Sequence, residues 1–135
     1  MKTKTIQQTI QLRAAPREVY QAIMNSRRHA AFTGMPASIS GKAGGKFTIG
    51  EDDLIRGRQL ELVPDERIVQ AWAIAMDGWP LGHESKLTLR LAAVEGGTRL
   101  EMTHEGVPVV CAAPVAQGWQ AYYWLPLKKY LEDER

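Results

Sequence analysis

The chain has 135 residues, a typical length for one domain, and its content of 44% hydrophobic and 24% charged residues is that of an ordinary globular protein. Its net charge of +2, without a basic cluster, gives no sign of a nucleic-acid partner or an anionic membrane surface. The single cysteine, Cys111, excludes an intramolecular disulfide, and no apolar run resembles a signal core or a roughly 20-residue membrane span, so we expect a cytoplasmic protein.

The N-terminal segment predicts one strand followed by two short helices. Residues 4–13 alternate between apolar and polar side chains, which is typical of a strand with one face toward solvent. Pro16 followed by Glu18 is typical of a helix start, because proline fits the first helical turn and an acid favours the positive end of the helix dipole. Ser26 is the expected cap of a second helix, which runs through about Phe32.

The middle of the chain predicts strands separated by turns such as Gly44-Gly45. Short links between consecutive strands favour an antiparallel meander. The segment 67–76 is apolar on both faces, which predicts a central strand or one whose outer face meets another element. The six predicted strands are 37–42, 45–50, 54–62, 67–76, 84–93 and 98–105.

The C-terminal segment predicts a long helix from about residue 115 to residue 132, in which half of the chain's aromatic residues lie. Its apolar arc is roughly 200° wide, about twice the width that a surface helix needs, so the helix must be covered on more than one side. Pro126 lacks an N–H and clashes one turn back, so we expect it to kink the helix or to free a carbonyl near Tyr122. The aromatic residues of this helix are Trp119, Tyr122, Tyr123, Trp124 and Tyr130.

These elements together predict an α+β helix-grip fold that forms a single domain over residues 1–135. A curved seven-stranded antiparallel sheet with one dry face would wrap around the long C-terminal helix, and the two short helices after the first strand would close one end. Glycines at positions 44, 45, 50 and 57 would permit the bends that such curvature needs.

Several short motifs occur in order along nearly the whole chain: Phe32-Thr33-Gly34, Gly44-Gly45-Lys46-Phe47, Leu62-Val63-Pro64 with Trp72, Trp79-Pro80 with Gly82-His83, Gly106-Val107-Pro108, and Gly118-Trp119-Gln120 with Tyr122-Tyr123. Together they resemble the activator of heat-shock protein 90 ATPase homologue family, within the START-like superfamily. The chain is most similar to the C-terminal domain of the eukaryotic co-chaperone. That co-chaperone's N-terminal domain, which makes much of the contact with the chaperone and carries much of the ATPase stimulation, has no counterpart in the sequence. The resemblance therefore implies contact with the chaperone more directly than it implies ATPase activation.

The residues that could carry chemistry do not form a recognisable catalytic or metal motif. The histidines, His29, His83 and His104, have no second ligand at metal-binding spacing. Cys111 has no base or cation beside it in the sequence to lower the pKa of its thiol. We therefore expect no catalytic residue, no metal and no cofactor.

A space between the sheet and the C-terminal helix is the expected ligand site, since ligand cavities are mostly apolar with a few placed polar groups. His104 and Gln70 are its candidate polar anchors, although each is also explained as a buried residue bonded to a backbone carbonyl or to water. The predicted lining residues are Phe32, Phe47, Gln70, Trp72, Leu89, Met102, His104, Trp119, Tyr122 and Tyr123.

Three functions follow from the sequence. The first is a non-catalytic domain that binds a small hydrophobic molecule in this cavity. The second, implied by the resemblance, is a co-chaperone-like protein that binds a heat-shock protein 90 homologue and modulates its ATPase, with the turn at Trp79-Pro80 as its contact surface. The third is a cavity enzyme of the cyclase or hydrolase type, which some START-like proteins are, and it would need a cavity group with a strongly shifted pKa.

Overall fold

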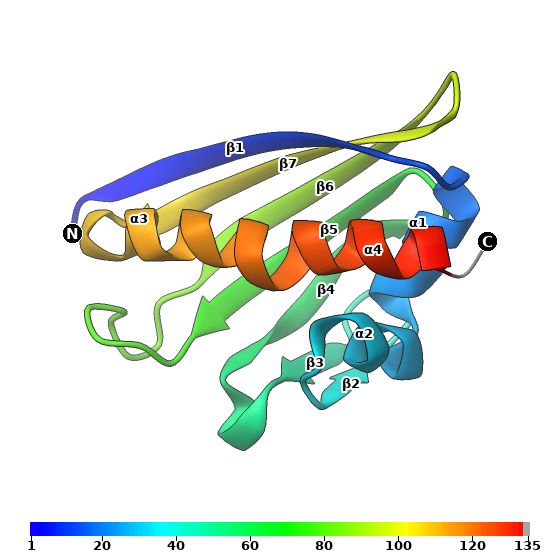
Figure 1. The fold of residues 1–135 in the computed structure, drawn as a ribbon. Coiled ribbons are helices and arrows are strands. Elements are labelled where there is room, and N and C mark those ends of the chain that lie inside the picture. The colour runs from blue at the N-terminus through cyan, green and yellow to red at the C-terminus, as the bar shows by residue number, and fades with distance from the viewer. Residues whose placement is uncertain (134–135) are drawn as a thin grey trace.

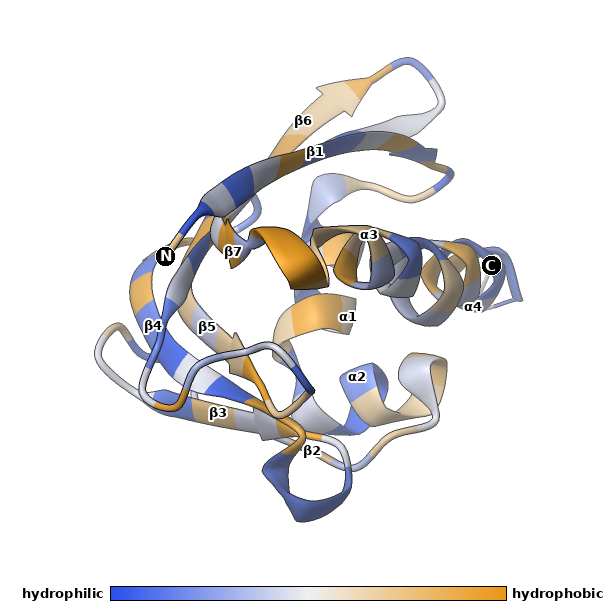
Figure 2. Cartoon of the chain, turned by 90° about the vertical axis from the view of Figure 1, so that its left-hand side faces the viewer, coloured by the Kyte–Doolittle hydropathy of each residue, from blue (hydrophilic) through white to orange (hydrophobic). Residues whose placement is uncertain are grey.

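A curved seven-stranded antiparallel sheet holds a long helical segment against its concave face in the computed structural model, which describes residues 1–133 (Figure 1). Figure 2 shows the strands forming an arc, with the helices on its inner side. This arrangement confirms the predicted α+β helix-grip fold. The strands are β1 (Thr3–Leu12), β2 (Ala37–Ile39), β3 (Lys46–Ile49), β4 (Ile55–Val63), β5 (Arg67–Ile74), β6 (Ser85–Val94) and β7 (Gly97–Pro108). The helices are α1 (Pro16–Met24), α2 (Ser26–Thr33), the 3-10 turn η1 (Glu51–Asp53), α3 (Val109–Gly118), the π-helical segment η2 (Trp119–Trp124) and α4 (Leu125–Asp133).

The strand β5 lies at the centre of the sheet, whose order is β1-β7-β6-β5-β4-β3-β2, so the central position predicted from its two apolar faces is confirmed. A row of paired residues, Phe47, Gly57, Trp72 and Ser85, crosses the sheet from β3 to β6. A Cβ atom at Gly57 would collide with the carbonyl oxygen of Ala71 and with the Phe47 ring. Glycine therefore allows the close backbone approach at this position of the curved sheet.

The inner face of β1 attaches the N-terminal strand to the C-terminal helix. Ile6 and Leu12 are buried there, as the alternation predicts. Gln8 lies on the same face and makes two hydrogen bonds. Its amide donates to the carbonyl of Ala116 at 3.0 Å, and its side-chain oxygen accepts from the Trp124 indole at 2.8 Å. Since a buried indole N–H needs an acceptor, Gln8 allows Trp124 to be buried completely.

The cap of α2 differs from the prediction by one residue. Asn25, not Ser26, is the N-cap, because its backbone is extended and its side chain accepts the N–H of Arg28 at 3.0 Å. The Ser26 hydroxyl instead accepts the backbone N–H of Ile39 at 2.9 Å and so connects α2 to β2. Gly34 ends the helix in the left-handed conformation, with φ of 74°.

The C-terminal helix begins earlier than predicted, at Val109 rather than near residue 115, and Pro114 lies inside α3. A proline in the second turn removes only the hydrogen bond to the carbonyl four residues back, which belongs to Val110 in the first turn. Val110 is 74% exposed, so water can satisfy that carbonyl. The cost that normally excludes proline from a helix interior is therefore small here.

The expected disturbance at Pro126 takes the form of a π-helical segment immediately before it. The N–H of Leu125 bonds to the carbonyl of Gln120, five residues back, instead of the carbonyl four residues back. The helix continues through this region as α4. The wider turn changes which side chains face the core, because Trp124 is almost fully buried whereas Tyr122 is 62% exposed.

Two strands differ most from their predicted bounds. The strand predicted for 37–42 ends at Ile39, because residues 42–44 form a bend and turn. The strand predicted for 98–105 runs from Gly97 to Pro108, because β1 provides a partner along most of that length. The longer β7 leads directly into α3.

Candidate functional site

The centre of the grip, where the sequence predicts a cavity, is filled by aromatic rings. Trp119 stacks on Trp124 at a centroid distance of 5.3 Å and packs against Tyr123 at 4.8 Å and Trp72 at 5.7 Å. The void that remains beside them has a volume of about 20 Å³. A space of that size holds one water molecule at most.

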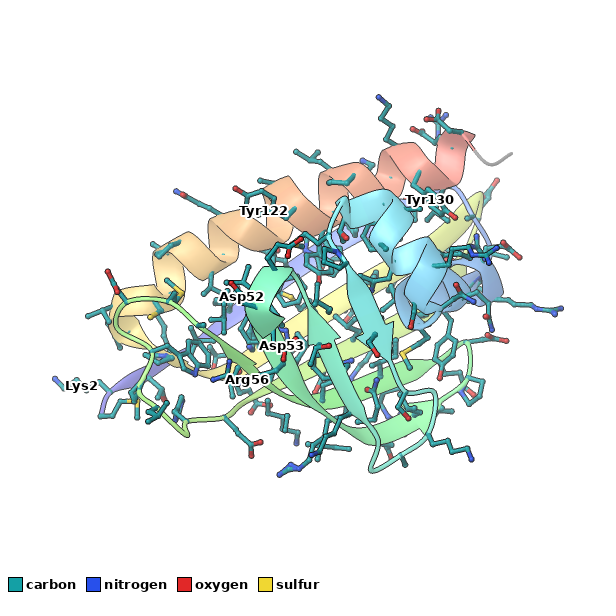
Figure 3. All side chains as sticks on the ribbon, turned by 90° about the horizontal axis from the view of Figure 1, so that it is seen from below. Lys2, Asp52, Asp53, Arg56, Tyr122 and Tyr130 are labelled. Carbon is teal, nitrogen blue, oxygen red and sulfur yellow. The ribbon has the colours of Figure 1, made fainter. Side chains whose placement is uncertain are left out.

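An apolar cleft lies to one side of these rings, with a volume of about 410 Å³. It lies between the helical segment α3–η2 and the ends of β4 and β5. Figure 3, which labels Tyr122 and Asp52, shows the helical segment and the loop around η1 facing each other in this region. The cleft is lined by Met35, Leu54, Ile55, Trp72, Ile74, Met76, Pro114, Val115, Gly118, Trp119, Tyr122 and Tyr123.

The predicted lining residues divide into three groups. Four of them line the cleft: Trp72, Trp119, Tyr122 and Tyr123. Three line the small void together with some of these rings: Phe47, Gln70 and Leu89. The other three line neither space and are buried in the core: Phe32, Met102 and His104. Most of the predicted residues therefore pack against one another in the core, and the apolar cleft lies beside them.

Several cleft residues are absent from the sequence-based list. Ile74, the last residue of β5, and Met76 just beyond it continue the apolar alternation of the strand, and this is the signal that could have identified them. Met35 and Leu54 lie in connections between elements, where no periodicity marks an inward side chain. All four are half-buried, as expected for side chains that border an unfilled apolar space.

His104 is bonded entirely within the protein. The Trp119 indole donates to Nδ1 of His104 at 3.1 Å, so Nε2 carries the proton and donates to the Ser85 hydroxyl at 2.8 Å. Ser85 in turn donates to the carbonyl of Trp72 at 2.8 Å. Burial lowers the pKa of His104 to about 3, which keeps the ring neutral. Because His104 is the donor to Ser85, this pair is not a nucleophile activated by a base.

Tyr123 is similarly engaged away from the cleft. Its hydroxyl donates to Nε2 of His29 at 2.9 Å, and Nδ1 of His29 donates to the carbonyl of Ile23 at 2.8 Å. Burial raises the pKa of Tyr123 and lowers the pKa of His29, so both stay neutral. The indole of Trp119 is likewise used, since it donates to His104. Among the described residues that line the cleft, the hydroxyl of Tyr122 is a side-chain polar group that has no hydrogen-bond partner.

The second predicted polar anchor, Gln70, also has a protein partner. Its amide donates to the side-chain oxygen of Gln59 at 3.0 Å, and the amide of Gln59 donates to the carbonyl of Ser40 at 3.1 Å. Gln59 lies opposite Gln70 in the register of β4 and β5 and is buried. The amide groups of both glutamines therefore donate to acceptors of the protein itself.

The turn at Trp79-Pro80 is less exposed than predicted. Trp79 is half-buried because its ring packs edge-on against Trp72 at 5.7 Å, and its indole donates to the carbonyl of His83 at 2.9 Å. Pro80 is exposed. Both residues border a second groove, of about 370 Å³, on the convex face of the sheet.

Within residues 1–133, no group of three or more His, Cys, Asp and Glu side chains is placed to hold a metal ion. Over the same residues, no helix combines the length and the apolar character needed to cross a membrane. Cys111 is buried, and burial raises the pKa of its thiol above the usual value. A raised pKa disfavours the thiolate, which is the reactive form of cysteine.

Comparisons with solved structures agree with the helix-grip architecture. An HSP90 activator from Plasmodium falciparum aligns with a TM-score of 0.80 at 22% identity, over 88% of this chain and 89% of that protein. A protein from Mesorhizobium loti aligns with a TM-score of 0.85 at 19% identity, over 98% and 99% of the two chains. At these identities the similarity establishes the fold alone.

Comparisons of sequence identify the family as well as the fold. The human protein named Activator of 90 kDa heat shock protein ATPase homolog 1 is 34% identical over 115 residues, which are 85% of this chain and 33% of that protein. A protein of Schizosaccharomyces pombe is 28% identical over 93% of this chain and 37% of its own length. The chain thus spans about a third of the length of these relatives. The family described as Activator of Hsp90 ATPase homolog 1-like protein matches residues 13–132, and this chain belongs to that family.

Proposed function

We propose that this protein is a non-catalytic binding domain whose ligand is a small, largely hydrophobic molecule held in the apolar cleft. The observation that carries the proposal is the cleft itself, an unfilled space of about 410 Å³ lined almost wholly by apolar side chains. Its volume lies in the range of about 300–1,000 Å³ that is usual for small-molecule sites. Buried apolar area, at about 25 cal/mol per Å², would supply the binding free energy.

The chemistry of the lining favours a neutral ligand. Among residues 1–133, no ionisable side chain other than the tyrosines Tyr122 and Tyr123 borders the cleft, and Tyr123 already donates to His29. A charged ligand would lose its hydration there without gaining a partner, which is costly. The rings of Trp72 and Trp119 instead offer flat apolar contact.

Gly118 provides a test of this site. It is helical, with φ of −61°, and a Cβ atom there would meet only the Tyr122 ring, at 3.8 Å. Gly118→Leu is expected to fit the backbone and to occupy the cleft, so that the neutral dye Nile red binds at least about tenfold more weakly. The measurement is a fluorescence titration of the purified protein.

Gly118→Ala is the matched control. It is expected to raise the free energy of unfolding by about 0.5–1 kcal/mol, because alanine restricts the unfolded chain more than glycine does, and to leave dye binding nearly unchanged. Equal dye affinity in the leucine and alanine variants, with both folded by circular dichroism, would place the dye elsewhere and contradict the proposal.

A second candidate function is contact with a heat-shock protein 90-type chaperone. It is supported by the human relative, which is named as an activator of that chaperone's ATPase and is 34% identical to this chain. Because the chain matches only about a third of that relative, binding and activation are separate questions. Isothermal titration against the host's own chaperone homologue is expected to show saturable binding, and a parallel ATPase assay measures activation. Absence of heat change at several temperatures would remove this candidate.

A further inference from the structure

The convex face of the sheet carries a groove with an unusual concentration of positive charge. Three cationic residues, Lys46 on β3 and Arg56 and Arg58 on β4, line it. The turn with Trp79 and Pro80 forms another part of its wall, and its volume is about 370 Å³. Gly57 belongs to the row of residues on the concave face, where Trp72 lines the apolar cleft. Because side chains alternate along a strand, its neighbours Arg56 and Arg58 point to the convex face, so the groove and the cleft lie on opposite faces of the sheet.

The register of the strands places two of these cations directly opposite each other. Lys46 pairs with Arg58, and Arg56 lies two residues along the same face. Like charges directly opposite on neighbouring strands destabilise a sheet. Within the part of the chain that the structure describes, the groove has one carboxylate, Glu84, which lies 3.1 Å from Arg58. Among the described residues, Lys46 and Arg56 have no carboxylate within ion-pair distance.

A second like-charge pair lies on the same face of the sheet. Arg67 lies opposite Arg90 in the register of β5 and β6. Glu61 lies 2.7 Å from Arg67, as Glu84 lies 3.1 Å from Arg58, so among the described residues one cation of each pair has a carboxylate at ion-pair distance. The groove differs because Arg56 adds a third cation, which leaves two of its three cations without a carboxylate partner among the described residues. Such local charge conflicts are expected at functional sites.

The lining of the groove combines cationic, small and apolar residues. Thr48, Gly57 and Ala73 line it together with the lysine and the two arginines. Trp79 and Pro80 add an apolar wall on which a hydrophobic side chain can pack. Arginine clusters beside apolar surface are a recurring means of recognising acidic peptide motifs.

We propose that this groove binds an extended acidic segment of a partner protein. Carboxylates of the segment would pair with Lys46, Arg56 and Arg58, and an adjacent apolar side chain would pack on Trp79 and Pro80. This proposal does not require a ligand in the apolar cleft, and it defines the partner protein only by its acidic segment. Occupancy by carboxylates would relieve the repulsion between Lys46 and Arg58.

The test uses a short fluorescein-labelled peptide in which glutamates flank a leucine, followed by fluorescence anisotropy. The wild-type chain is expected to bind this peptide, with an affinity that falls as salt is added. The double variant Lys46→Gln/Arg56→Gln is expected to bind roughly tenfold more weakly. Arg99→Gln is the matched control, because Arg99 lies on β7 beside Glu101, at 2.9 Å, outside the groove. It is expected to bind as the wild type does.

A stability measurement separates a binding role from a structural one. Lys46→Gln alone is expected to leave the thermal midpoint unchanged or to raise it, because it removes the repulsion with Arg58, while still weakening peptide binding. Nile red binding in the cleft is expected to be unaffected. Equal affinity for the glutamate peptide and for the same peptide with glutamines would overturn the proposal. Equal affinity in the double variant and in Arg99→Gln, or tighter binding of single-stranded DNA than of the peptide, would also overturn it.

Discussion

Replacing Trp119 with alanine is expected to lower the free energy of unfolding by about 3–5 kcal/mol, the usual cost of truncating a buried tryptophan. The side chain is only 4% exposed, and its ring contacts Trp72, Tyr123 and Trp124. The change also removes the donor to Nδ1 of His104, which is then buried without a partner. Urea denaturation near neutral pH measures the effect.

Two control variants divide this cost into its parts. Trp119→Phe keeps most of the packing but removes the indole N–H, and the expected loss is about 1–3 kcal/mol. Tyr122→Ala alters a residue of the same helical segment that is 62% exposed, and the expected change is below about 1 kcal/mol. A loss at Trp119 no larger than that at Tyr122 would show that the rings do not form the core described above.

Acidification is expected to destabilise the fold well before carboxylates titrate, because two buried histidines are held neutral. Burial lowers the pKa of His104 from 6.5 to about 3 and also lowers the pKa of His29. The unfolded chain therefore binds protons first as the pH falls. Stability is complete above pH 6.5 and is lost as the pH falls toward 3, by about 1.4 kcal/mol per pH unit for His104 alone.

The measurement is the free energy of unfolding in urea at about pH 7 and about pH 5, where the expected loss is at least about 2 kcal/mol. His83→Asn is the matched control, because His83 is half-buried and its ring donates to the carbonyl of Gly106 at 2.7 Å. That variant retains His29 and His104, so it is expected to retain the loss of stability that these two residues cause. A flat profile between these pH values would mean that His29 and His104 are protonated without cost in the folded chain.

The sequence predicts the architecture well because the architecture follows from periodicity. Alternation places Ile6 and Leu12 on the inner face of β1, and two apolar faces identify β5 as the central strand. The wide apolar arc of the C-terminal segment predicts a wrapped helix. The start of that helix is mispredicted because Pro114 is tolerated in its second turn, where the carbonyl that it leaves unbonded belongs to an exposed residue.

The position of the cleft could not be predicted in the same way. Periodicity indicates which side chains face inward but not whether their volumes fill the space between sheet and helix. Trp119 and Trp124 fill the centre together, and the π-helical turn between them brings Trp124 inward and leaves Tyr122 exposed. The border of the cleft depends on Met35 and Leu54, whose positions come from the path of two connections. Likewise, the hydrogen-bond partners of His104, which are Ser85 and Trp119, lie on two other elements and share no sequence spacing.

The most direct test of the apolar cleft uses the methyl groups of four methionines, two of which line the cleft and two of which lie in the core. Met35 and Met76 line the cleft, whereas Met24 and Met102 are buried elsewhere. An NMR titration of isotopically labelled methionine with naphthalene, a neutral apolar probe, reports on all of them at once. We expect saturable shifts of the Met35 and Met76 signals, with the Met24 and Met102 signals nearly unchanged. Shifts centred on Met102, or no saturable shift at Met35 and Met76, would contradict a ligand site beside the helix.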